Sequence, residues 1–172
     1  MIYDNGDDSK YRWGPQIEES EPKHEWFKLR LDPTREGGNS DLARRYPSSL
    51  VSPPIRRVHS EKLVVDYLTA LRKHTEYILE QKLSKVVVQR TPKEYIITVP
   101  AVWSPKAREK TISCAKDAGM GSEDSIHMIT EPEAAALYEL NERSNLGLRV
   151  GDTFVVCDAG GGYVVILVPK LV

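Results

Sequence analysis

Residues 153–168 read TFVVCDAGGGYVVILV, in which two apolar, β-branched runs flank an aspartate and three consecutive glycines. The runs from Thr153 to Cys157 and from Tyr163 to Val168 have the composition of strands. The loop from Asp158 to Gly162 that joins them is short and rich in glycine, which is typical of a β-hairpin. The stretch therefore predicts at least one antiparallel pair of strands.

The three glycines are also the most specific chemical feature of the chain. Gly160, Gly161 and Gly162 can adopt the positive φ angles that point successive N–H groups at one anion, as in a phosphate-binding nest. A dinucleotide fingerprint or a P-loop needs a helix after its glycines, whereas here a strand follows. Asp158 could hold a hydrated magnesium ion beside phosphates. The alternative is an ordinary glycine-rich hairpin turn.

Upstream of this stretch, helical and extended patterns alternate. Apolar residues recur at helical spacing from Ser60, the expected N-cap, to about Leu83. The run Tyr95 to Val99 has no polar alternation and is closed by Pro100, which predicts a strand covered on both faces.

Further elements follow in the same alternating order. Ser104 and Pro105 open a helix that stops at Gly119. Residues 125–129 form a weaker strand pattern, and residues 130–133 have capping-box spacing before a helical run over 134–142. The order predicts an α/β fold with a mixed sheet and flanking helices.

The first third of the chain is less regular. We expect residues 1–58 to form an irregular segment and residues 59–172 to form an α/β domain. Two short strands, Ile2–Tyr3 and Tyr11–Trp13, are expected around the turn signal in residues 4–6. Residues 32–54 show no sustained period and are expected to be loop or partly disordered.

Composition limits the classes of partner. The 172 residues are 40% hydrophobic and 28% charged with a formal net charge of -1, so nothing favours broad nucleic-acid or anionic-membrane binding. No apolar run approaches the roughly 18 residues of a membrane helix, and the acidic N-terminus is unlike a secretory signal. Cys114 and Cys157 lie in apolar segments, which predicts two buried thiols in a reducing compartment. We therefore expect a cytoplasmic protein.

Several short motifs together resemble the nucleotide-binding domain of the heat shock protein 70 family, in the actin-like ATPase superfamily. They are ITVPA at 97–101, Arg108, AKDAG at 115–119, EPEAAA at 131–136 and DAGGG at 158–162. YRWG at 11–14 and HEWFKL at 24–29 are similar to a divergent branch common in fungi. The resemblance is firm from about Ser60 to Ile166. It implies a partial actin-like ATPase domain, related to the ribonuclease-H fold, with an incomplete first lobe.

The resemblance implies a site for ATP or ADP with Mg²⁺. Asp158 would orient magnesium-bound water, and Gly160, Gly161 and Gly162 would form the second phosphate-binding loop. Glu131 would lie near the metal and the attacking water. Lys28 would approach the transferred phosphate. Phosphoryl transfer needs such positioning more than covalent help.

Pro100 and Arg108 resemble a proline switch and its relay, which report the nucleotide state to a neighbouring domain. Each of these residues also has an ordinary structural alternative. Pro100 could simply end a strand, and Arg108 could be a surface charge. Glu131 could face a helix dipole, and Lys28 could be a solvated lysine.

The chain departs from the family pattern at two positions after the glycines. Tyr163 and Val165 stand where the family has a threonine that can contact the terminal phosphate and an aspartate of the metal shell. The family's first phosphate loop and its adenosine-binding segments are also expected to be missing, so the resemblance implies truncation at both ends. The strands 95–99 and 154–157 would then have uncovered faces, which predicts poor solubility.

Our first hypothesis is an ATP-binding domain fragment like those of heat shock protein 70 chaperones, with little or no ATPase activity and with nucleotide binding weak or lost. The alternative is a non-catalytic pseudo-ATPase module that uses the surface of helix 60–83 to bind protein partners or co-chaperones. A third possibility is another actin-like ATPase such as a sugar kinase, against which the motif at 131–136 argues.

Overall fold

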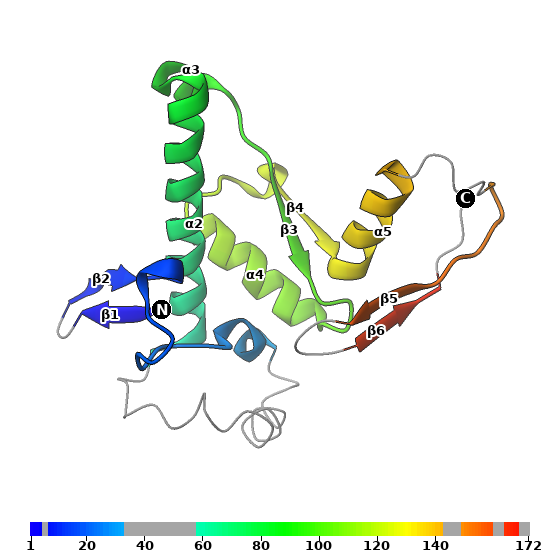
Figure 1. Cartoon of the computed structure of the whole chain (residues 1–172), viewed down its shortest axis with the longest axis horizontal. Coiled ribbons are helices and arrows are strands. Elements are labelled where there is room, and N and C mark those ends of the chain that lie inside the picture. The colour runs from blue at the N-terminus through cyan, green and yellow to red at the C-terminus, as the bar shows by residue number, and fades with distance from the viewer. Residues whose placement is uncertain (5–6, 33–57, 143–148, 160–163, 169–172) are drawn as a thin grey trace. The chain divides into compact units, whose positions relative to one another are not determined.

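Helices and short sheets share the chain between two compact units. The structure, a computed structural model, describes residues 1–4, 7–32, 58–142, 149–159 and 164–168 (Figure 1). One unit contains Met1–Glu94 and Ser104–Ser125, and the other contains Tyr95–Trp103 and Ile126–Val172. The fold is mixed α/β, as the alternating patterns predict.

The first unit is built around the long helix α2 (Ser60–Leu83). It packs against α4 (Pro105–Asp117), α3 (Lys85–Arg90) and the 3₁₀ helix η2 (Phe27–Leu31). The buried apolar side chains of these elements form its core: Leu31, Leu63, Val64, Ala70, Val88, Ala107, Cys114 and Ala115. Full burial of one leucine of this kind stabilises a fold by about 1.5–3 kcal/mol.

A hairpin at the N-terminus belongs to the same unit. Strands β1 (Ile2–Asp4) and β2 (Asp7–Arg12) pair antiparallel, which confirms the predicted hairpin, although β2 begins earlier than expected. The tip of its turn, residues 5–6, lies outside the described residues. The 3₁₀ helix η1 (Gly14–Gln16) follows β2 directly.

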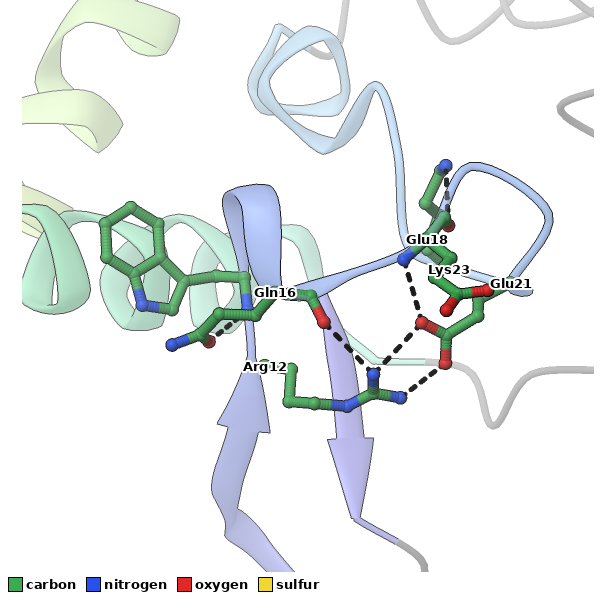
Figure 2. Close-up of polar contacts among 6 residues, drawn as sticks. Arg12, Gln16, Glu18, Glu21 and Lys23 are labelled. Atoms are coloured by element: carbon green, nitrogen blue, oxygen red, sulfur yellow. Dashed lines mark hydrogen bonds and ion pairs between the residues drawn. The ribbon is translucent and has the colours of Figure 1, made fainter.

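An exposed ion pair holds the chain after the hairpin (Figure 2). The guanidinium of Arg12 donates to both carboxylate oxygens of Glu21, at 3.0 and 2.6 Å, and to the carbonyl of Gln16 at 3.1 Å. Glu21 also accepts from the backbone N–H of Glu18 at 2.8 Å. A bidentate ion pair of this kind fixes the orientation of both side chains. It therefore ties the end of β2 to the segment that ends at Glu21.

Two helix ends of this unit follow the sequence signals. The Ser104 hydroxyl accepts from the backbone N–H of Ala107 at 3.3 Å, and Pro105 is the first residue of α4. Gly119 follows the helix with φ 77°, a conformation that glycine adopts at little cost. At α2 the prediction was wrong by one residue, because His59 occupies the N-cap position and Ser60 is already helical. A short 3₁₀ helix η5 (Glu123–Ser125) ends the unit.

The second unit combines a parallel strand pair, a helix and a hairpin. Strands β3 (Tyr95–Val99) and β4 (Ile126–Thr130) pair in parallel, and α5 (Glu131–Glu142) starts directly after β4. Strands β5 (Val156–Ala159) and β6 (Val164–Leu167) pair antiparallel, which confirms the predicted hairpin. Helix α5 packs against β3, β4 and β5.

The sheets differ from the expected mixed sheet. The described residues form three separate two-stranded sheets, β1–β2, β3–β4 and β5–β6. The prediction that strand 95–99 is covered on both faces was wrong, because Ile96 is 69% exposed while Val99 is fully buried. The burial alternates along β3 as in a strand with one covered face. Apolar composition alone does not reveal this difference.

The two cysteines differ in exposure. Cys114 is buried as predicted, but the prediction was wrong for Cys157, which is exposed in strand β5. Helix α3 was not predicted. Its six residues are too few to produce a helical period.

Throughout the described ranges, every helix is either too short or too polar to cross a bilayer.

Candidate functional site

The corner between β4 and α5 places Glu131. The Thr130 hydroxyl accepts from the backbone N–H of Glu133 at 3.3 Å, while the Glu133 carboxylate accepts from the Thr130 N–H at 2.8 Å and from its hydroxyl at 2.7 Å. This confirms the predicted capping box. The helix therefore begins at Glu131, three residues earlier than the expected helical run, and Glu131 is half-buried in its first turn.

Asp158 lies in the strand that packs against this helix. Its backbone pairs with Val165 across the β5–β6 hairpin, and α5 packs against β5. The second unit therefore contains both carboxylates that the resemblance assigns to the metal and the attacking water. Gly160, Gly161 and Gly162 lie outside the described residues.

Pro100 follows β3 in the same unit. It is fully buried, and its carbonyl accepts from the backbone N–H of Trp103 at 3.1 Å, closing a turn over the buried Trp103. Burial and a tight turn account for a proline here on structural grounds. Pro100 directly follows β3, which pairs with β4, the strand that ends just before Glu131.

Lys28 and Arg108 belong to the first unit. Lys28 is exposed on η2, and Arg108 lies partly exposed on α4. Helix η2 packs against α4 within this unit. The structure does not bring them together with Glu131 or Asp158 in one unit.

A buried carboxylate between η2 and α4 was not expected. Asp32 is fully buried, and it accepts from the Ser104 hydroxyl at 3.0 Å and from the Ser104 N–H at 3.5 Å. A buried charge needs such partners, and the N-terminus of a helix favours a negative one. Asp32 lies outside any helix or strand, as the predicted loop from residue 32 onward requires, but its burial was not predicted; residues 33–54 lie outside the described ranges. No local signal links Asp32 to a residue 72 positions away.

A second cluster missed from the sequence joins the hairpin to α2. The Tyr3 hydroxyl and the Lys62 ammonium both contact Asp66 Oδ2 at 2.6 Å, and the Tyr11 hydroxyl donates to the Asp66 carbonyl at 3.0 Å. Burial, followed by the charge of Asp66, raises the pKa of Tyr11. The spacing of Lys62 and Asp66 is a helical ion-pair signal, but the tyrosines come from far away in the chain. This cluster anchors the hairpin.

In the part of the chain that the structure describes, His, Cys, Asp and Glu side chains form no group of three or more that could hold a metal ion. No protein-family model, curated protein or solved structure matches the chain. Functional assignment therefore rests on the residues themselves.

Proposed function

We propose that the chain is a nucleotide-binding module of the heat shock protein 70 type, with an actin-like ATPase fold, that binds Mg-ATP or Mg-ADP weakly and hydrolyses ATP slowly or not at all. One observation carries the proposal. The parallel pair β3–β4 runs into α5 at Glu131, and α5 packs against β5, the strand that carries Asp158 towards the three glycines.

The donor set suits magnesium held largely by water and phosphate. Mg²⁺ on nucleotides is usually held by one or two carboxylates and keeps several waters, so a group of three protein ligands is not required. Asp158 would hold the hydrated ion through its water, and Glu131 would lie near the ion. When bound, the ion would neutralise phosphate charge and position water. Glu131 would accept a hydrogen bond from the attacking water.

Weak binding follows from the two residues after the glycines. Tyr163 and Val165 replace a hydroxyl and a carboxylate that would contact phosphate and metal shell. Loss of one charge-assisted contact costs about 1.5–3 kcal/mol. We therefore expect a dissociation constant above about 10 μM for Mg-ATP.

A fluorescence titration with N-methylanthraniloyl-ADP in the presence of Mg²⁺ tests the proposal. The unaltered chain should bind, EDTA should reverse the signal, and Asp158→Asn and Glu131→Gln should each weaken binding about tenfold or more. Glu142→Gln, at the other end of α5, is the matched control and should bind as the unaltered chain does.

Two results would overturn the proposal. Binding that both carboxylate variants retain would exclude this site, and a dissociation constant below about 10 μM with turnover would exclude the weak module. A chain that unfolds cooperatively but shows no response to nucleotide would favour the non-catalytic protein-interaction module instead.

A further inference from the structure

The corner where α2 meets α3 exposes apolar side chains to solvent. Leu83 is 55% exposed, Val86 is 60% exposed and Val87 is 48% exposed. Ile78 and Tyr77, five and six residues before Leu83 on α2, are exposed as well. Single exposed apolar residues are ordinary, but a cluster on adjacent elements is typical of an interaction surface.

Basic residues surround this apolar cluster. Residues 77–90 contain Lys82, Lys85 and Arg90 against one acidic residue, Glu80, in a chain whose net charge is -1, and Lys93 follows shortly after α3. Lys82, Lys85 and Arg90 are exposed, and no ion pair joins them to the rest of the described chain. Lys93 lies 3.8 Å from Glu76. The corner is therefore locally positive.

The chain turns between α2 and α3 at Ser84, whose backbone has φ 83° and ψ 149°. The turn between the two helices can be followed in Figure 1. Val88 is buried and fixes α3 to the unit. The hydroxyl and the N–H of Thr91 both donate to the Val87 carbonyl, at 2.7 and 3.0 Å, and close the end of α3. A surface ordered before binding loses less entropy on association.

We propose that this α2–α3 corner, residues 77–90, is a docking site for an acidic segment of a partner protein that carries apolar side chains among its Asp and Glu residues. The apolar cluster would take the partner's apolar side chains, and Lys82, Lys85 and Arg90 would pair with its carboxylates. The proposal is independent of nucleotide binding.

The observations favour a protein segment over other occupants. A helix that lies on a membrane has a long continuous apolar face, whereas α3 has six residues and the buried face of α2 is already used in the core. The chain's own acidic run, residues 18–21, contains no apolar side chain. It could pair with the basic residues of the corner but could not fill the apolar cluster.

Fluorescence anisotropy tests the docking site with a defined probe. The probe is a labelled peptide of about 15 residues in which Leu and Phe recur among Asp and Glu. The unaltered chain should bind it, and affinity should fall as salt rises. The variants Lys82→Glu/Lys85→Glu and Val86→Ser/Val87→Ser should each weaken binding about tenfold or more. Lys106→Glu on α4 and Leu137→Ser on α5 are the matched controls and should bind within about twofold.

The same experiment also tests whether a membrane or a second copy of the chain, rather than an acidic segment, occupies the corner. Circular dichroism first verifies that each variant keeps its helices, which is expected because all substituted side chains are exposed. A probe with Asn and Gln in place of Asp and Glu should bind at least about tenfold more weakly. Equal binding of that neutral probe would overturn the proposal, and so would an affinity that the corner variants leave unchanged. Association only with vesicles of phosphatidylcholine and phosphatidylserine would point to a membrane instead. Self-association through the corner without peptide binding would point to a second copy of the chain, and either result would also overturn the proposal.

Discussion

Asp32 is the buried charge on which the packing of η2 against α4 depends. Its carboxylate has no solvent exposure and accepts from the Ser104 hydroxyl. Asp32→Ala removes the acceptor and leaves a small cavity, and we expect it to lower the free energy of unfolding by about 1–3 kcal/mol. Glu109→Ala, on the exposed face of α4, should change it by less than about 0.5 kcal/mol. Urea unfolding followed by circular dichroism measures both, and equal values would contradict the role of Asp32.

Glu21 titrates far below an ordinary glutamate. The hydrogen bond from Arg12, followed by that from the Glu18 N–H, lowers the pKa of Glu21 from 4.5 to about 2. Because the folded-state pKa is depressed, the stabilisation from this group is fully present above pH 4.5 and is lost as the pH falls towards 2. NMR titration of the Glu21 carboxyl should give a midpoint near 2, and Arg12→Gln should move it back towards 4.5. An unchanged midpoint in that variant would contradict the ion pair.

The two cysteines should differ in reactivity. Burial, followed by the charges of Glu61 and Asp117, raises the pKa of Cys114 to about 11, whereas Cys157 is exposed. The thiolate is the reactive form, so a disulfide reagent at pH 8 should modify Cys157 rapidly and Cys114 only after unfolding. Cys157→Ser should abolish the rapid phase and Cys114→Ser should keep it. Rapid reaction of Cys114 in the folded chain would show that α4 does not pack on α2.

Helix ends were the elements easiest to predict, because their signals are local. Ser104 with Pro105, Gly119, and Thr130 with Glu133 each lie within one turn of the backbone they cap. Sheet arrangement was not predictable in the same way, since the exposure of Ile96 depends on what covers β3 rather than on its own residues. Helix α3 was missed for a different reason, because its six residues are too few to show a helical period.

The capping box at the start of α5 should have a measurable effect on stability. Thr130→Ala removes the hydroxyl that accepts from the Glu133 N–H, and we expect a loss of about 0.5–2 kcal/mol in the free energy of unfolding. Thr75→Ala, at an exposed position inside α2, should cause no loss because alanine favours the helix. Thermal unfolding compares the two variants. A Thr130→Ala chain as stable as the unaltered one would mean that the start of α5 is fixed by packing alone.

At the scale of the whole molecule, the candidate residues divide between two units. Glu131, Asp158 and Pro100 lie in one unit, and Lys28 and Arg108 lie in the other. The motifs could be found in the sequence because each is a short run. Their division, the Asp32–Ser104 contact and the Tyr3–Asp66 contact could not, because they join residues far apart in the chain.

The most direct test of the nucleotide proposal is a ¹⁵N NMR titration of the chain with ATP, with and without Mg²⁺. The proposal predicts magnesium-dependent shifts of the backbone signals of Glu131, Asp158 and Gly160 to Gly162, with a dissociation constant above about 10 μM. Signals of the α2–α3 corner should stay unchanged. Absence of shifts at these residues at millimolar nucleotide, or shifts confined to other residues, would contradict it.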